Sequence, residues 1–414
     1  MEIIDQEQKK DKGKTMYEIG SEFNLEKAVR RDDFISIYSD LAQRGSKNIE
    51  FLRCGRDAIG FVADDIIAKN KGLKHVFIPA LSCDSMVKPF EVRGMEVTYY
   101  KIEENLCIAK DALFDRIEEV MGGTSESEAF AVLIMNFFGI ADTDEISDGL
   151  KKSFPNVLII EDVTHILMEP ESFLFEKDRA DYYVGSIRKW LGIPDGAFAI
   201  SNTEFVMGAL TGETDFTALR MQALTEKTEY LDNGDSELKT HFRELLSEAE
   251  DSLSDGLDPY HMSEVSADYL SDIDLYRISD RRRANYRNLY KKLECLPLCG
   301  KAFRLLPEIP VNGNSEGYKY TPFMLPIVLD IEFMRRSAIT DDGKNITRDG
   351  FEKRLALRGI YAPVLWPIAE EGAAICYNAK GFSENMLAFW IDQRYSRFDM
   401  ENIVDILGDE LSRM

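Results

Sequence analysis

Residues 157–166 read VLIIEDVTHI, a run of four apolar residues that is followed directly by two acids. A second apolar run, AVLIM, covers residues 131–135. Strands that are buried on both faces of a parallel sheet appear in a sequence as continuous apolar runs, whereas half-exposed strands alternate. Both stretches therefore predict strands of a parallel sheet that is covered by helices.

The same pattern continues on either side of these two runs. From about residue 50, helix-like amphipathic stretches alternate with short apolar runs, which is typical of an α/β fold. The predicted strands cover residues 75–79, 95–102, 130–136, 157–161, 181–185 and 197–201. The predicted helices cover residues 57–69, 110–121 and 144–153.

The character of the sequence changes after residue 203, where long, charged, helix-prone stretches begin. From residue 296 onward short apolar runs such as FMLPIVLD and MLAFWID return, which indicates a smaller α+β domain. We expect an N-terminal segment at residues 1–45 and a large α/β domain at residues 46–255. The small C-terminal α+β domain, with a long connecting helix, is expected at residues 256–414.

The composition excludes several classes of protein. The chain has 414 residues, of which 44% are hydrophobic, and its formal net charge is −24. Such a chain is neither disordered nor collagen-like, and its charge argues against nucleic acid or an anionic membrane as a partner. No run approaches the roughly 18 apolar residues of a membrane helix, and residues 1–14 resemble no targeting peptide. We therefore expect a cytoplasmic protein.

Cysteine and histidine spacing predicts neither a disulfide scaffold nor a metal site. The six cysteines are scattered along the chain, and only Cys295 and Cys299 lie close together in the sequence. No Cys or His pair follows them at zinc-finger spacing.

Lys189 is the first candidate for chemistry. It follows the apolar run ADYYVG and precedes the turn-prone sequence GIPDG. Active sites of open α/β sheets lie beyond the carboxyl ends of the strands, where a lysine can serve as a Schiff-base nucleophile. The alternative is a solvated lysine in a surface loop.

Asp162 and His165 strengthen this interpretation. Asp162 ends the apolar run of residues 157–160, and His165 follows three positions later. Pyridoxal phosphate needs a lysine for its aldehyde and an acid that keeps its ring nitrogen protonated. Asp162 could be this acid, and His165 could contact the ring hydroxyl. Alternatively, Asp162 is a helix cap or a surface acid, and His165 is a histidine of the core.

The turn LRCGRDAIGF at residues 52–61 could hold the phosphate of such a cofactor. Gly55 opens an apparent helix there, and free backbone N–H groups at a helix start attract anions. Arg56 lies beside Gly55, and Ser186 could add a hydroxyl from a neighbouring strand. Asp57 would repel a phosphate, so its side chain should turn away. The alternative is an ordinary capped helix start.

Together these segments resemble the DegT/StrS-type aminotransferases, which are fold-type-one enzymes that use pyridoxal phosphate. The resemblance covers about residues 50 to 410 and rests on the motifs CGRDAI, NFFG, IIEDVTH, SIRKWLGIPDGAF and LRGIYAPVLWP in this order. It implies an aspartate-aminotransferase-like large domain, with a mostly parallel seven-stranded sheet between helices, and a smaller C-terminal α+β domain.

The resemblance also implies a role for each motif residue. Lys189 would carry the covalent link to the cofactor aldehyde, Asp162 would bind the pyridine nitrogen, and His165 would lie by the ring hydroxyl. The phosphate would be held by Gly55, Arg56 and Ser186.

Three features depart from the family pattern. Cys83 stands where the family often has an aromatic residue that stacks on the cofactor ring. The interval from Ser186 to Lys189 is shorter than usual. In addition, residues 216–218 replace a Gly-Tyr-Asn group whose Asn reaches the neighbouring subunit's phosphate in relatives. These departures loosen the substrate assignment more than the cofactor assignment.

The reaction that the resemblance implies is amino transfer, from glutamate or glutamine to a ketone such as a nucleotide-linked keto sugar. Such an enzyme would serve sugar-nucleotide or polysaccharide biosynthesis as a homodimer. The diphosphate of such a substrate could be bound by Arg188, Arg220 and Arg394. Each of these arginines could instead form an ion pair within the protein. One alternative is a lyase or desulfurase of the same fold that acts on an amino acid. Another is a non-catalytic protein that binds pyridoxal phosphate.

Overall fold

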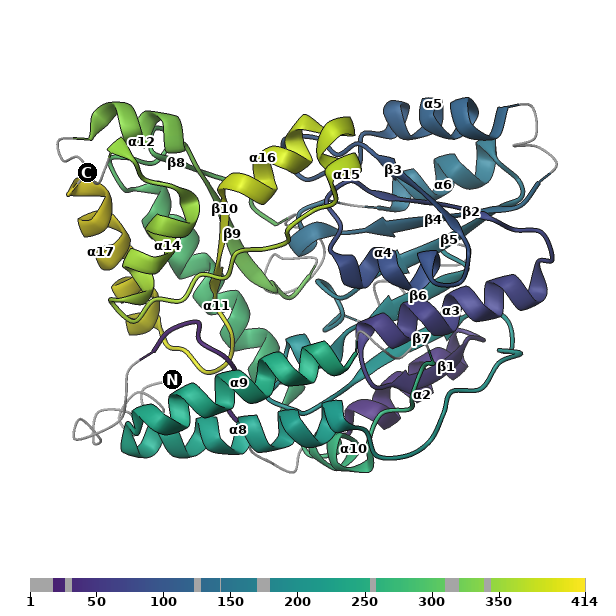
Figure 1. The fold of residues 1–414 in the computed structure, drawn as a ribbon, viewed down its shortest axis with the longest axis horizontal. Helices are drawn as coiled ribbons and strands as arrows, with labels where there is room; N and C mark the ends of the chain where they lie inside the picture. The colour runs from purple at the N-terminus through teal and green to yellow at the C-terminus, as the bar shows by residue number, and fades with distance from the viewer. Residues whose placement is uncertain are drawn as a thin grey trace.

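The computed structural model describes residues 18–26, 32–122, 128–141, 143–169, 179–253, 258–309, 320–338 and 344–413. Its large sheet lies at one end of the molecule and a smaller sheet at the other, with two long helices along one side (Figure 1). None of the helices in these ranges is both long enough and apolar enough to cross a membrane.

The large sheet has seven strands in the order β1-β7-β6-β5-β4-β2-β3. Only β7 runs antiparallel to its neighbours, and the other strands are parallel. The seven strands are β1 (Asn48–Leu52), β2 (His75–Pro79), β3 (Glu96–Tyr100), β4 (Phe130–Met135), β5 (Val157–Asp162), β6 (Tyr182–Gly185) and β7 (Ala197–Ser201).

This sheet confirms the predicted α/β fold and all six predicted strands, with shifts of at most two residues at their ends. All residues of β4 are buried, as its continuous apolar run predicts. The sequence analysis missed β1, an edge strand in which four of five residues are only half-buried. Its sequence NIEFL has no continuous apolar run, so it lacks the signal that identified the central strands.

Helices connect the parallel strands and cover the sheet (Figure 1). Of these, α3 packs on β6 and β7, and its N-terminus points toward the carboxyl end of β6. The covering helices are α2 (Phe34–Arg44), α3 (Gly55–Lys69), α4 (Asp84–Glu91), α5 (Lys110–Met121) and α6 (Asp144–Ser153).

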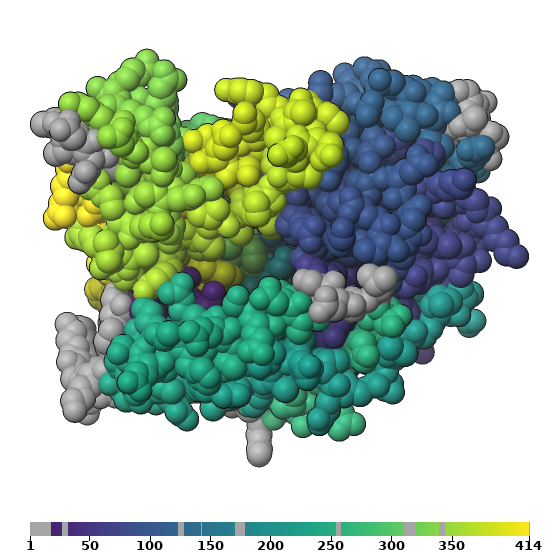
Figure 2. Space-filling model, in the orientation of Figure 1, coloured from purple at the N-terminus to yellow at the C-terminus, as the bar shows by residue number. Residues whose placement is uncertain are grey.

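Two long helices, α8 (Asp215–Asn233) and α9 (Ser236–Ser252), form an antiparallel hairpin. Gly234 ends α8 in the left-handed conformation, with φ of 73°, and Asp235 caps the start of α9 through its side chain. Figure 2 shows this teal hairpin lying beneath both the blue part of the large domain and the yellow-green C-terminal part. The hairpin therefore spans the two halves of the molecule.

The C-terminal part contains an antiparallel three-stranded sheet in the order β10-β9-β8, as expected for an α+β domain. Residues 260–273 still attach to the large domain through the bridges Leu52–His261 and Asp32–Ile273. The boundary at residue 255 stays a prediction. The elements of this part are α10 (Glu264–Leu270), α11 (Leu275–Glu294), β8 (Phe303–Leu305), β9 (Met324–Leu329), α12 (Ile331–Ser337), α14 (Arg348–Ala356), α15 (Glu370–Ile375), α16 (Tyr377–Asn385), β10 (Met386–Trp390) and α17 (Arg397–Ser412).

Residues 18–26, which we call the N-terminal strap, connect the small domain to the large one. Near its start, Ile19 pairs with the chain around Ile360, and its N–H donates to the carbonyl of Gly359 at 2.8 Å. At its end, the N–H of Glu26 donates to the carbonyl of Gly192 at 2.8 Å. A Cβ at position 192 would lie 1.8 Å from the carbonyl oxygen of Asn24, so only glycine permits this approach.

A buried charge cluster fixes the start of the strap. The carboxylate of Glu18 accepts hydrogen bonds from the Nζ atoms of Lys227 on α8 and Lys239 on α9, and its side chain is only 4% exposed. Burial raises the pKa of Glu18, but the two lysines outweigh burial and lower it to about 2. The folded protein therefore strongly favours the ionised carboxylate.

We predict that this cluster makes stability depend on pH in the acid range. The lowered pKa of Glu18 stabilises the folded state fully above its ordinary value of 4.5, and this contribution disappears as the pH falls toward about 2. Urea unfolding of Glu18→Gln should show a loss of about 2 to 3 kcal/mol at pH 7 relative to wild type.

The difference should shrink as the unfolding is repeated at pH values below 4.5. Glu229→Gln, on the exposed face of α8, is the matched control and should follow wild type at each pH. A Glu18→Gln protein as stable as wild type at pH 7 would contradict the prediction.

Candidate active site

Lys189 ends the short 3-10 turn η3 (Ile187–Lys189), which follows directly after β6. Ile187 is buried and anchors the turn, and the N–H of Trp190 closes it on the carbonyl of Ile187 at 2.9 Å. Lys189 is half-buried, and its Nζ makes no hydrogen bond or ion pair with any residue in the described ranges. The amine is therefore held near the sheet, without a hydrogen bond to a carboxylate among the described residues.

Asp162 is the last residue of β5, and β6 lies beside it. Its Oδ1 accepts a hydrogen bond from the N–H of Thr164 at 2.9 Å. Burial raises the pKa of Asp162, while that hydrogen bond and the charge of Lys189 act in the opposite direction. Burial prevails, so the pKa of Asp162 lies above its ordinary value, and a cation close to this carboxylate would stabilise its ionised form.

His165 completes the group. Burial and the charge of Lys189 both lower the pKa of His165 well below its usual range, so the imidazole is neutral. Its Nδ1 accepts the N–H of Phe138 at 3.0 Å, which places the proton on Nε2. The ring stacks on Phe323 at 4.4 Å and on Trp366 at 5.7 Å between ring centroids.

Phe138 is a residue that sequence reasoning missed. It has φ of 58°, an uncommon conformation for a residue other than glycine. This left-handed conformation accompanies the hydrogen bond that fixes the tautomer of His165. The motif NFFG marks the place, but no sequence pattern reveals that a phenylalanine there adopts positive φ.

The N-terminus of α3 and Ser186 form a small polar recess. Cys54 precedes the helix without a side-chain cap, so the first N–H groups of α3 have no acceptor within the helix. Ser186 is 2% exposed, and its Oγ has no hydrogen-bond partner among the residues that the structure describes. A Cβ on Gly55 would lie 3.6 Å from this oxygen. Unpaired buried donors at a helix start suit a phosphate.

Asp57 does not oppose an anion in this recess. Its two carboxylate oxygens accept hydrogen bonds from Arg53 at 2.8 and 3.0 Å. The charge of this carboxylate is therefore balanced by Arg53. This agrees with the expectation that the side chain of Asp57 turns away from a phosphate. Arg53 also covers the ring of Tyr260 at 4.8 Å from its centroid.

For Arg56 and Cys83, the contacts within the protein do not indicate a cofactor contact directly. The guanidinium of Arg56 donates to the carbonyl of Leu253 at 3.2 Å and to the hydroxyl of Ser85 at 3.3 Å, while its buried Nε has no partner among the described residues. Cys83 precedes α4 and is half-buried, with no hydrogen bond from its side chain to the described residues. Their predicted cofactor contacts stay predictions.

Arg188 and Arg220 come together around one carboxylate. Glu250 of α9 receives the guanidinium of Arg188 at 3.0 Å and that of Arg220 at 3.6 Å. Both cations lie over the ring of Phe216, at 5.3 and 5.5 Å from its centroid. Burial raises the pKa of Glu250, but the charges of Arg188, Arg220 and Lys189 outweigh it and lower the pKa. This cluster therefore adjoins the Lys189 turn.

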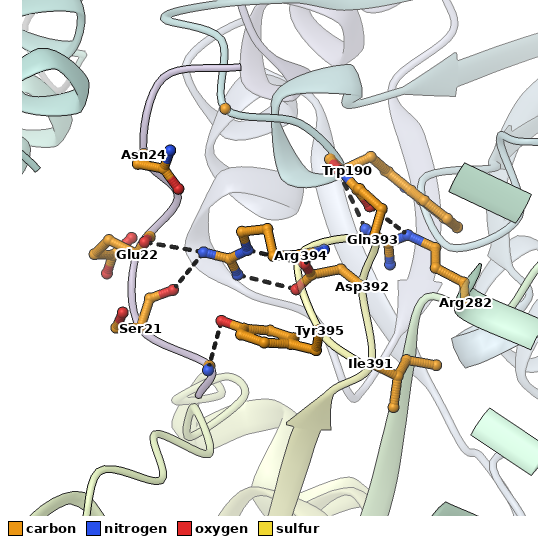
Figure 3. A network of polar contacts seen from close by, with 12 residues as sticks. Ser21, Glu22, Asn24, Trp190, Arg282, Ile391, Asp392, Gln393, Arg394 and Tyr395 are labelled. Atoms are coloured by element: carbon orange, nitrogen blue, oxygen red, sulfur yellow. Dashed lines mark hydrogen bonds and ion pairs between the residues drawn. The ribbon is translucent and has the colours of Figure 1, made fainter. Parts of the chain in front are cut away.

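Arg394 has a different position. Its Nε and Nη2 donate to Asp392 at 2.8 and 2.9 Å, and its Nη1 donates to the carbonyls of Ser21 and Glu22 at 3.0 Å (Figure 3). The guanidinium also lies 3.9 Å from the ring centroid of Phe23. These contacts fasten the N-terminal strap, so they do not favour the predicted substrate contact.

Glu161, beside Asp162, has a structural role. It is fully buried and accepts hydrogen bonds from Arg179 at 2.5 Å and from the hydroxyl of Thr143 at 2.6 Å. Arg179 also pairs with Asp144 at 2.6 Å. This network fixes the end of β5, and so the position of Asp162. Nowhere in the described ranges do three His, Cys, Asp or Glu side chains cluster as a metal site would require.

Comparison with known proteins identifies the fold. No protein-family model matches the chain, and no curated protein matches it. Among solved structures, a DegT DnrJ EryC1 StrS aminotransferase from Brucella abortus is 12% identical, over 92% of this chain and 91% of its own, with a TM-score of 0.57. The chain has the fold of this aminotransferase.

Two further structures share this aminotransferase fold with the chain. DesI, solved with its TDP-sugar product, is 13% identical over 92% of this chain and 84% of its own, with a TM-score of 0.58. A NifS-like protein is 12% identical over 92% of this chain and 88% of its own, with a TM-score of 0.53. At this level of identity the likeness shows the fold, so the chemistry must be argued from the site.

The recess at α3 leads to a prediction for Ser186→Ala. A hydrogen bond to a charged group is worth about 1.5 to 3 kcal/mol, so the variant should bind pyridoxal phosphate at least about 10-fold more weakly. Its thermal midpoint without cofactor should equal that of wild type, because the lost hydroxyl has no partner. An absorbance titration and a thermal melt measure the two effects.

Ser201→Ala is the matched control. The Oγ of Ser201, which is also buried, accepts the N–H of Thr203 at 3.1 Å. This variant should lose stability and keep its affinity for the cofactor. Equal affinities for Ser186→Ala and wild type would contradict the phosphate assignment.

Proposed function

We propose that the protein is an aminotransferase of the DegT/StrS type that uses pyridoxal phosphate. The observation that carries this proposal is the convergence of Lys189, Asp162 and His165 at the carboxyl ends of β5 and β6. The charge of Lys189 acts on the pKa values of both other groups, so the three side chains share one site. The aminotransferase fold agrees with this arrangement.

The residues of the site fit the cofactor. The unpaired hydroxyl of Ser186 and the free N–H groups around Gly55 would hold its phosphate, with Arg56 beside them. Asp162 would accept a hydrogen bond from the protonated ring nitrogen, and the positive charge of the ring would stabilise this buried carboxylate in its ionised form. When bound, pyridoxal phosphate supplies an electron sink that makes the substrate Cα acidic.

The side chains would divide the remaining work. His165 is neutral and carries its proton on Nε2, which makes no hydrogen bond with the described residues, so it can donate to the ring hydroxyl. Lys189 lies at the end of η3, its amine makes no hydrogen bond within the described ranges, and it would take the proton from the substrate Cα. The rings of Phe323 and Trp366 stack on His165 and help to shield it from water, since its side chain is buried.

The proposed donor comes from the resemblance to the family, and the charges near Lys189 support the proposed acceptor. The amino donor would be glutamate or glutamine. Arg188 and Arg220 both pair with the one carboxylate of Glu250 among the described residues, so they would be able to bind a further anionic group. A nucleotide-linked keto sugar carries such a group in its diphosphate, and DesI was solved with a TDP-sugar product. We propose such a keto sugar as the amino acceptor.

The second candidate is a lyase or desulfurase of the same fold. The short interval between Ser186 and Lys189 favours it. A desulfurase needs a mobile thiol, and Cys54 and Cys376 are both buried. Burial also raises the pKa of the Cys54 thiol to about 12, which makes it a poor nucleophile.

The first test is the visible absorption spectrum of the protein with pyridoxal phosphate. Wild type should develop a yellow band that Lys189→Ala lacks, because the band requires the lysine amine. Adding L-glutamate should bleach the band of wild type as the amino group moves to the cofactor. The exposed Lys152→Ala is the matched control and should behave as wild type.

The outcomes separate the candidates. A band that depends on Lys189 but ignores glutamate and glutamine would favour the lyase. Absence of such a band would overturn the cofactor assignment and each role derived from it.

We also propose that the protein works as a homodimer in the cytoplasm, as the resemblance to the family implies. Light scattering of the purified protein measures the mass directly. A value near twice 47.2 kDa would support the dimer, and a value near 47.2 kDa would contradict it.

A further inference from the structure

Arg282 of α11 is a buried cation without an ion-pair partner in the described ranges. It is 0% exposed, and burial lowers its pKa to about 10. Taking a guanidinium out of water costs several kcal/mol. Its contacts with neutral groups must therefore offset this cost.

Those contacts converge on the backbone of the candidate site. The Nη1 of Arg282 donates to the carbonyl of Phe323 at 2.8 Å, and its Nη2 donates to the carbonyl of Trp190 at 3.2 Å. Gln393 accepts from Nε of Arg282 at 3.2 Å and donates to the same Trp190 carbonyl at 3.0 Å (Figure 3). The guanidinium also lies 4.3 Å from the centroid of the Trp190 indole.

Both carbonyls belong to residues that hold the reacting groups. Trp190 directly follows Lys189, and its Nε1 donates to the carbonyl of Thr164 at 2.6 Å. Phe323 stacks on His165 at 4.4 Å. One guanidinium therefore ties the turn of Lys189 to the aromatic wall of His165.

The loop that carries Gln393 is fixed in the same way. Asn285, one turn along α11 from Arg282, donates to the carbonyls of Ile391, Asp392 and Tyr395 at 3.0 to 3.2 Å. Helix α11 thus fixes the positions of Arg282 and Gln393, the two side chains that donate to the Trp190 carbonyl. A shift of the small domain would move the two donors together.

We propose that Arg282, supported by Gln393, is a positioning residue that sets the orientation of Lys189 toward the cofactor and the amino substrate. The inference rests on the proposed function. Lys189, and not Arg282, shifts the pKa values of Asp162 and His165, so Arg282 acts through geometry. A planar fork can hold two carbonyls at once, which an ammonium group cannot do with the same directionality.

Two conservative variants test this role. Arg282→Lys keeps the charge and loses the fork. Gln393→Glu keeps an acceptor for Arg282, now as a carboxylate, and loses the donor to the Trp190 carbonyl. Stopped-flow absorbance measures how fast each variant forms the Lys189-dependent band with pyridoxal phosphate. A titration of that band measures its pH midpoint.

Both variants should form the band about 10-fold more slowly than wild type, because misplacing a reactive group by a fraction of an ångström costs rate. The pH midpoint of the band should shift as well. For Gln393→Glu the thermal midpoint should stay equal to that of wild type or rise, because the new carboxylate pairs with Arg282. If these residues had only a structural role, a Gln393→Glu protein as stable as wild type would form the band at the wild-type rate.

The controls are Arg277→Lys on the exposed face of α11 and Gln43→Glu at the end of α2, which should both behave as wild type. Wild-type rates and pH midpoints in Gln393→Glu and Arg282→Lys would overturn the inference alone. Failure of the wild type to form a Lys189-dependent band would instead overturn the proposed function, and the inference with it.

Discussion

The parallel register of β4, β5 and β6 is the constraint on which the site depends. Met135 pairs with Asp162, and Asp162 pairs with Val184, so three strands end at nearly the same level. Whatever follows each strand must then lie at one edge of the sheet. The turn of Phe138, the segment from Asp162 to His165 and the turn of Lys189 meet there for this reason, although they are widely separated in the sequence.

The central strands and the residues at their ends could be predicted from the sequence because continuous burial leaves a continuous apolar run. Asp162 and Lys189 also follow such runs, so their places could be inferred. The half-exposed strand β1 could not be predicted, because its sequence mixes apolar and polar residues. The left-handed conformation of Phe138 could not be predicted either, because it depends on tertiary contacts. The role of Arg394 was equally hidden, because the strap that it binds comes from the other end of the chain.

Local charge in the site runs opposite to the charge of the whole protein. The chain carries a net charge of −24, yet Arg188, Arg220 and Lys189 all act on the single carboxylate of Glu250, with Glu22 as a further acid that acts on the two arginines. Buried cations feel little screening by salt, so a local excess of positive charge can attract an anion to a strongly acidic protein. The α8–α9 hairpin supplies Arg220 and Glu250 and therefore belongs to the site as much as to the scaffold.

The three tryptophans of the chain give the molecule an optical property of its own. Trp190 lies beside Lys189 under the guanidinium of Arg282, and Trp366 stacks on His165. Trp390 meets Phe23 of the strap edge to face, at 5.3 Å between ring centroids. Because each indole adjoins the site or the strap, intrinsic fluorescence should report on these regions without any attached label.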